Sequence, residues 1–344
     1  MVTDIAPVHA LVSQVMDGVG TPSVLLPQGS SPHGYAMRPS DMGRLADADF
    51  VFWMGEGLTP WLGRAIEAGA TDAQSMVLAD VDGLVRLGYR TGARFEAHDH
   101  GDEHGHDDHG HDDEHGHDDD HKDEHAHADD HDDHGHDKHD DDKHGHDDNG
   151  HDEHAHDDHG HDDHGHDHGP DAVDPHFWLD PQNAITWLAY IAAELSAADP
   201  ENAARYTENA ASATAELKAV SAKLDERLAP VRGNPYIVFH DAYHYFEARF
   251  DVEATGAVSV GDATAPGPRR LAEIREVIAE TNAVCVFSEP QFDARLVQTV
   301  AEGTKARTGV LDPLGSKLEP GPALYAELLM GLAESLRGCI APDA

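Results

Sequence analysis

A stretch of 71 residues, 98–168, limits what this 344-residue chain can fold into more than any other part of its sequence. It holds 25 of the chain's 30 histidines, 30 acidic residues and three lysines, and it contains no Val, Ile, Leu, Phe, Tyr or Trp. Because it cannot bury apolar area to offset the entropy of ordering its backbone, we expect it to be disordered without a ligand. Loop-closure entropy grows only with the logarithm of length, so a fold can carry this insert as a surface loop.

The insert repeats the unit His-Gly-His-Asp-Asp, as at residues 104–108. Neutral imidazole is a common metal ligand and carboxylates add oxygen ligands, which suits Zn, Ni or Cu(II). A solvated acidic linker would need acidic residues for solubility but not 25 histidines, so the composition favours metal binding. Because the loop is expected to be flexible, we expect it to hold several ions weakly. The expected ligands in three of the repeats are His104, His106, His134, His136, His164 and His166.

The charge and patterning of the chain exclude several classes of partner. The formal net charge is −44, from 67 acidic and 23 basic residues. A nucleic-acid partner requires a basic surface, so none is expected. No run of 18 apolar residues is present, so we expect no membrane insertion. Residues 1–4 do not resemble a signal peptide, which leaves a cytosolic chain or one whose signal peptide has been removed.

Outside the insert, strand-like and helix-like stretches alternate. The main strands are expected at 23–26, 50–54, 236–239, 283–287 and 308–311. Strands alternating with helices are typical of parallel sheets covered on both faces. A long helix rich in Ala, Glu and Lys has only a thin apolar stripe, which favours a rigid connector. We therefore expect an α/β protein of two lobes, residues 1–200 and 229–344, joined by a linker helix at 201–228.

The chain has two cysteines and no CxxC motif. Cys285 lies in an apolar run that predicts a buried strand, and Cys339 lies just past the last predicted helix. Two cysteines in a chain of this size fit one structural disulfide formed in an oxidising compartment. Two unrelated buried thiols fit the sequence as well.

Five histidines lie outside the insert: His9, His33, His176, His240 and His244. His33 and His240 follow predicted strands and His176 opens a turn. Ligands of open α/β sheets bind beyond the carboxyl ends of the strands, where Asp312 also arrives. Three imidazoles with an oxygen ligand or water make a tetrahedral zinc site. His9 is expected to pack on a helix. His244 could share a helical face with His240, although its helix is expected to point away.

Five motifs occur in an order that resembles one known family. They read LPQGSSPHGY with RPSD at 26–41, HFWLDP at 176–181, VFHDAY at 238–243, SEPQF at 288–292 and LDPLG at 311–315. Across essentially the whole chain they resemble the ZnuA-type zinc-binding proteins, which belong to the cluster A-I (cluster 9) solute-binding proteins of ABC importers. A histidine-rich insert before the second motif is also typical of this zinc branch.

The resemblance implies two α/β lobes joined by one long helix, with Zn²⁺ held in the cleft by His33, His176 and His240. The related manganese branch tends to carry a carboxylate in place of His240, so the imidazole favours zinc. Glu289 is a weaker candidate for the fourth ligand and is expected instead to orient an imidazole through its other N–H. The resemblance also pairs the two cysteines, Cys285 and Cys339, in a disulfide.

One departure from the family pattern concerns the fourth ligand. Some zinc members carry Glu immediately before the first ligand histidine, whereas this chain has Pro32, which offers no ligand atom. Asp312 matches the last carboxylate of the family. The fourth position is therefore expected to hold either Asp312 or a water molecule.

The function implied by the resemblance is a monomeric, non-enzymatic periplasmic receptor, with its signal peptide removed, that delivers Zn²⁺ to the integral-membrane permease of an ABC importer. No Walker A pattern is present, so ATP hydrolysis belongs to another subunit. The insert is expected to act as a low-affinity reservoir or sensor. The alternatives are a metal buffer or chaperone acting through the insert, a nickel receptor, and a metallohydrolase, although the chain lacks HExxH.

Overall fold

The fold is given by a computed structural model that describes residues 1–69, 73–90, 92–95, 172–259 and 266–343. These residues belong to one compact unit. The predicted disorder at 98–168 and the six expected ligand histidines of the insert lie outside the described residues. Within them, none of the helices is long and apolar enough to cross a membrane.

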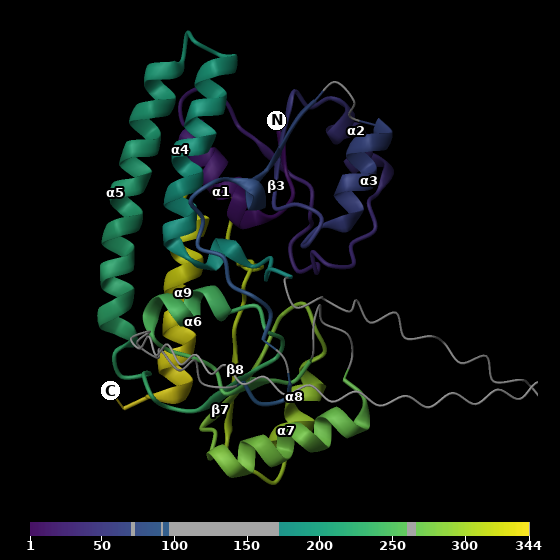
Figure 1. Cartoon of the computed structure of the whole chain (residues 1–344), viewed down its shortest axis with the longest axis vertical. Coiled ribbons are helices and arrows are strands. Elements are labelled where there is room, and N and C mark those ends of the chain that lie inside the picture. The colour runs from purple at the N-terminus through teal and green to yellow at the C-terminus, as the bar shows by residue number, and fades with distance from the viewer. Residues whose placement is uncertain (70–72, 91, 96–171, 260–265, 344) are drawn as a thin grey trace, which may run out of the picture. The chain divides into compact units, whose positions relative to one another are not determined.

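The first sheet is parallel and four-stranded, in the order β2-β1-β3-β4. Its strands are β1 (Val2–Thr3), β2 (Ser23–Val24), β3 (Phe50–Trp53) and β4 (Gln74–Val77). They are linked by α1 (Ala6–Val15), α2 (Pro39–Ala46) and α3 (Pro60–Gly69). Because parallel crossovers are right-handed, the reversal of direction after β2 places α1 on one face and the other two helices on the opposite face, as Figure 1 shows.

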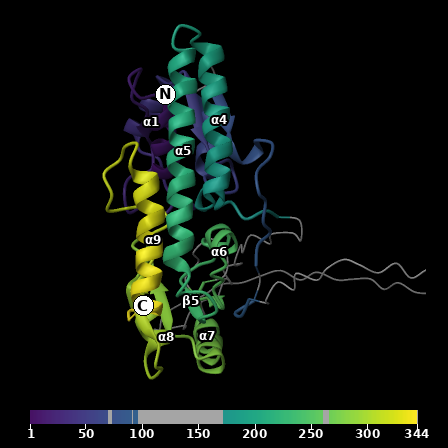
Figure 2. The same cartoon turned by 90° about the vertical axis from the view of Figure 1, so that its left-hand side faces the viewer.

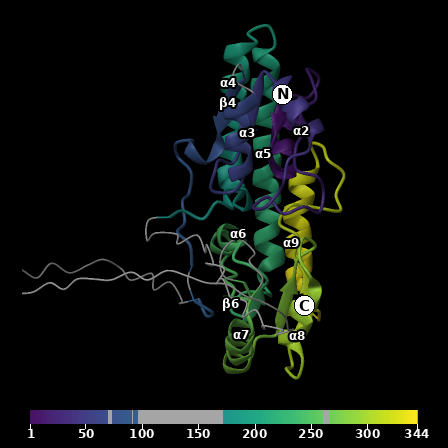
Figure 3. The same cartoon turned by 90° about the vertical axis from the view of Figure 1, so that its right-hand side faces the viewer.

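The second sheet repeats this arrangement in the order β6-β5-β7-β8. Its strands are β5 (Tyr236–Val238), β6 (Gly256–Ala257), β7 (Cys285–Ser288) and β8 (Arg307–Val310). The linking helices are α6 (His244–Phe250), α7 (Pro268–Thr281) and α8 (Ala294–Ala301). Figure 3 shows α7 and α8 together beside this sheet. In register, Tyr236 of β5 pairs with Cys285 of β7.

Three longer helices connect and cover the sheets. They are α4 (Pro181–Ala198), α5 (Ala203–Leu228) and α9 (Leu324–Ile340). Helix α5 packs along α4 and then along α9, side by side with both in Figure 2. Its buried residues form the thin stripe expected from the sequence. Helix α9 contacts both α1 and β8, so it bridges the two sheets alongside α5.

The structure confirms the α/β class with two parallel sheets, and it differs from the sequence prediction in several elements. Strands β4 and β6 and helix α3 were not predicted. Strand β4 is a half-exposed edge strand with the polar sequence QSMV, so it lacks the apolar run of a buried strand. The final helix continues through Gly338, a residue typical of helix ends, because Cys339 and Ile340 pack into the core. Cys339 therefore lies inside α9 and not beyond it.

Candidate metal centre

Three histidines from distant parts of the chain meet at one point. His33 lies in the loop after β2, His176 precedes the short 3-10 helix Phe177–Leu179, and His240 follows β5. One ligand nitrogen from each ring lies within 4.8 Å of the other two. His176 and His240 are buried and His33 is half-buried. Imidazole nitrogens at this spacing can bind one metal ion together.

Two of the three imidazoles are oriented by buried carboxylates. Nδ1 of His176 lies 2.7 Å from Oδ1 of Asp174, and Nδ1 of His240 lies 2.7 Å from Oε1 of Glu289. A neutral imidazole that donates from Nδ1 presents the lone pair of Nε2 to a metal. Burial raises the pKa of Asp174 well above its ordinary value, and the neighbouring Asp241 carboxylate raises it further. Asp174 was not predicted from the sequence, although its place two residues before His176 was a signal.

Tryptophans hold the loops that carry the site. Nε1 of Trp61 in α3 donates to the carbonyl oxygen of Pro32 at 2.7 Å, directly before His33. Nε1 of Trp178 donates to the carbonyl oxygen of Pro313 at 2.8 Å. These buried indoles satisfy their N–H groups by fixing backbone that borders the site.

A buried ion-pair cluster ties the segment before the insert to the His240 loop. Nε of Arg90 donates to the carboxylate of Asp241 at 3.0 and 3.1 Å, and Nη1 lies 2.7 Å from Oε2 of Glu247 in α6. The Arg90 side chain is 6% exposed and Glu247 is fully buried. Burial opposes the charge of Arg90, but the two carboxylates dominate and raise its pKa. No local sequence signal predicts this cluster, because Arg90 lies 151 residues from Asp241.

Of the other expected residues, Asp312 lies outside the three-histidine group. Within the described residues, that group contains no carboxylate. His9 is buried in α1 with Nε2 3.2 Å from the Pro22 carbonyl oxygen, and burial lowers its pKa. His244 is buried at the first residue of α6, also outside the group.

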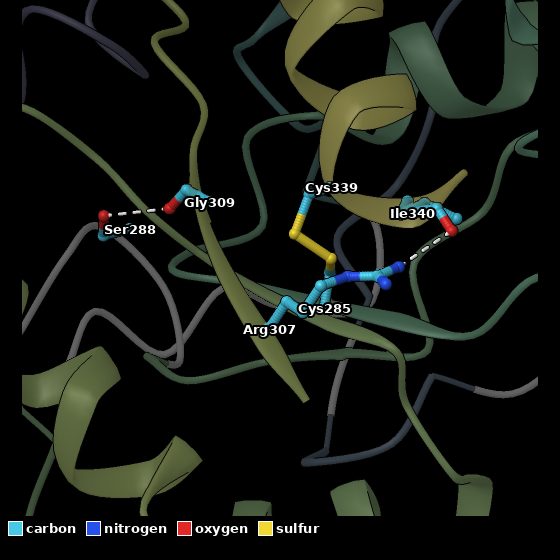
Figure 4. The surroundings of a disulfide bond; sticks show 6 residues. All are labelled: Cys285, Ser288, Arg307, Gly309, Cys339 and Ile340. Carbon is cyan, nitrogen blue, oxygen red and sulfur yellow. Dashed lines mark hydrogen bonds between the residues drawn. A yellow bond between two sulfur atoms is a disulfide. The ribbon is translucent and has the colours of Figure 1, made fainter. Parts of the chain in front are cut away.

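The predicted pairing of the two cysteines is confirmed. A disulfide joins Cys285, the first residue of β7, to Cys339 in α9, with 6.2 Å between the Cα atoms (Figure 4). Beside it, Nη2 of Arg307 donates to the carbonyl oxygen of Ile340 at 3.1 Å. The bond therefore fastens the end of the last helix to the second sheet.

Comparison with known proteins identifies relatives along the whole chain. The model of the family "ZnuA: Zinc-uptake complex component A periplasmic" matches residues 1–339. The chain is 44% identical over 344 residues to the high-affinity zinc uptake system protein ZnuA of Paracoccus denitrificans, covering 100% of this chain and 92% of the relative. It is 42% identical over 340 residues to the protein of the same name from Brucella abortus, covering 99% and 91%.

Solved structures share the fold. A crystal structure of ZnuA superimposes with a TM-score of 0.68 at 21% identity, covering 99% of this chain and 98% of that one. The solute-binding protein FpvC of Pseudomonas aeruginosa, in complex with Ni²⁺, gives a TM-score of 0.68 at 18% identity, covering 100% and 97%. At these identities the likeness concerns the fold alone.

Proposed function

Because the chain belongs to the ZnuA family of periplasmic zinc-uptake components, as its five motifs indicated, we propose that His33, His176 and His240 form its one tight zinc site. We further propose that the chain hands the ion to the membrane permease of an ABC importer. The family is one of transport components, and zinc is its cargo. The observation that carries the proposal is the meeting of the three ring nitrogens within 4.8 Å.

The chemistry of the three side chains favours zinc as the cargo. Zn²⁺ accepts imidazole nitrogen in tetrahedral sites, whereas Mn²⁺ prefers oxygen ligands. Asp174 and Glu289 hold two of the rings through Nδ1, which orients Nε2 and makes it more basic. Loss of an orienting carboxylate of this kind typically lowers metal affinity by about 10- to 100-fold.

The arrangement of the ligands also supports a carrier that releases its cargo. His33 and His176 lie on loops between the helices and strands of the first sheet, whereas His240 follows a central strand of the second. A small displacement between these elements would separate the three nitrogens and weaken the site. Helices α5 and α9 and the Arg90 cluster limit such a displacement, so we propose that release needs contact with the permease.

A nickel receptor is the second candidate. Imidazole ligands suit Ni²⁺ as well as Zn²⁺, and FpvC, which shares this fold, has been crystallised with Ni²⁺. The role of the insert as an accessory reservoir or sensor also remains a proposal, since residues 98–168 lie outside the described part of the chain.

Zinc uptake in the host cell tests the proposal. A strain without the gene, grown under zinc limitation, is supplied with the parent chain, with His176→Ala or with a chain lacking residues 98–168. We expect the parent and the shortened chain to restore cellular zinc and His176→Ala to fail. Restoration of nickel but not zinc would support the nickel receptor. Uptake that depends on the insert and not on His176 would support the metal buffer.

A further inference from the structure

The carboxylate of Asp312 is already occupied by its own turn. Its Oδ1 accepts from the backbone N–H groups of Leu314 at 3.2 Å and Gly315 at 3.0 Å. Its Oδ2 accepts from the N–H and the hydroxyl of Ser316 at 2.6 and 2.7 Å. A carboxylate has about four acceptor sites, so the turn takes up most of its hydrogen-bonding capacity. Asp312 could bind a metal only by giving up contacts that shape the turn.

A further donor to Asp312 identifies a residue nearer the site. Nε2 of Gln291 donates to Oδ1 of Asp312 at 3.2 Å. A carboxylate can only accept, so the reversed amide would bring two acceptors into contact. The hydrogen bond therefore assigns the NH₂ group to the Asp312 side and leaves Oε1 directed elsewhere.

That amide oxygen has no partner in the described part of the chain. Oε1 of Gln291 is buried and makes no hydrogen bond there. Gln291 lines the small cavity that His33, His176 and His240 also line. A buried acceptor without a partner is unfavourable, and native structures rarely retain one without a reason. Such an acceptor needs a bound water or ion as its partner, and the three imidazoles that line the same cavity can hold a metal ion.

Building on the zinc site of the proposed function, we propose that Oε1 of Gln291 is the fourth ligand of the bound ion and that Asp312 positions it. Asp312 holds the NH₂ group and thereby directs the carbonyl oxygen of the same amide. Three imidazoles and one amide form a neutral ligand set. A carboxylate in the fourth position would add a negative charge and favour hard cations such as Mn²⁺ more strongly than the neutral amide does.

The test is a zinc titration of the full chain against a chelator, with parallel Co²⁺ absorption spectra to report the coordination geometry. The variants are Gln291→Ala and Gln291→Glu, with Gln298→Ala as a matched control because Gln298 is an exposed glutamine in α8. We expect Gln291→Ala to weaken zinc binding by about 10-fold or more and to change the Co²⁺ spectrum. We expect Gln291→Glu to raise the affinity for Mn²⁺ relative to Zn²⁺, and Gln298→Ala to match the parent.

The outcomes separate this proposal from the function on which it rests. If Gln291→Ala keeps the parent affinity and Co²⁺ spectrum while His240→Ala loses the tight site, the zinc site stands and Gln291 is not its ligand. If His240→Ala also binds like the parent, the three-histidine site is wrong and the assignment of Gln291 is lost with it. The thermal midpoint of each variant shows whether it has folded.

Discussion

The two sheets share one strand order, yet they end their central strands differently. Strands β1 and β3 of the first sheet correspond in position to β5 and β7 of the second. After β1 comes Asp4, whose Oδ2 accepts from the N–H of Met54 after β3 at 2.8 Å. After β5 comes His240, whose Nδ1 meets Oε1 of Glu289 after β7 at 2.7 Å. The first junction links side chain to backbone, and the second links imidazole to carboxylate.

The shared strand order decides where the strand ends meet, and the residues at those ends decide whether a metal ligand lies there. Both sheets bring the carboxyl ends of their central strands together at one edge, as open parallel sheets do. In the first sheet the carboxylate of the buried Asp4 bonds backbone groups at that edge, and its Oδ1 also accepts from the N–H of Ile5 at 2.7 Å. In the second sheet His240 keeps a ring nitrogen directed to the site. The first sheet contributes to the site through loops, which carry His33 and His176.

Breaking the ion-pair cluster of Arg90, Asp241 and Glu247 has the largest expected effect on the unfolding free energy. Arg90→Met would leave Asp241 and Glu247 buried without their cation, and removal of one partner from a buried pair costs about 3–5 kcal/mol. Denaturant unfolding of the metal-free protein measures the loss. Arg269→Met is the matched control, because Arg269 pairs with Glu273 but is 94% exposed, and we expect no shift in its midpoint. Equal midpoints for the two variants would contradict the structural role of Arg90.

Removing the disulfide sharpens the contrast between the sheets, because the bond ties the end of α9 to a strand of the second sheet. The paired residues are 54 positions apart, and in the chain-entropy model a loop of this length contributes about 4 kcal/mol. We expect the variant with both Cys285→Ala and Cys339→Ala to unfold at a lower denaturant concentration, with an unfolding free energy lower by about 4 kcal/mol. The parent measured with reductant is the control. Hydrogen exchange should rise in β7 and α9 before β1 and β3, and a uniform rise along the chain would contradict this local role.

The buried carboxylate of Asp4, which follows the first strand, predicts that the unfolding free energy depends on pH. Burial raises the pKa of Asp4 to about 6, against an ordinary value of 3.8. The folded state therefore binds the proton more tightly, and stability falls as the pH rises from about 4 to about 6, by about 3 kcal/mol in total. In Asp4→Asn this contribution should vanish, so its unfolding free energy should fall less over that range. Parallel pH profiles for Asp4→Asn and the parent would show that Asp4 titrates normally.

Local signals in the sequence predict His240 at a sheet edge, whereas the full set of three ligand histidines needed the family resemblance. Short apolar runs mark the strands, and a polar residue directly after such a run, such as His240, lies at the carboxyl edge of a parallel sheet. The cysteine count favoured a disulfide but also allowed two free thiols, and the family resemblance decided between them.

The contacts around the histidines could not be predicted, because they depend on long-range packing or turn geometry. Arg90 and Glu247 are far apart in the sequence and meet only through tertiary packing. Asp312 follows a strand like His240 does, but Gly315 has a φ of 68°, and the turn directs its neighbouring N–H groups onto the Asp312 carboxylate. The sequence pattern predicts a metal ligand at both positions. The turn instead makes Asp312 a hydrogen-bond acceptor for its own backbone.

The most direct test of the account is a zinc titration against a chelator of known affinity on a chain lacking residues 98–168, with and without His240→Ala. We predict one tight site in the shortened chain and its loss in the variant, while both keep the same thermal midpoint without metal. A shortened chain with no tight site would place the function in the insert. An unchanged tight site after His240→Ala would show that the three histidines do not hold the zinc.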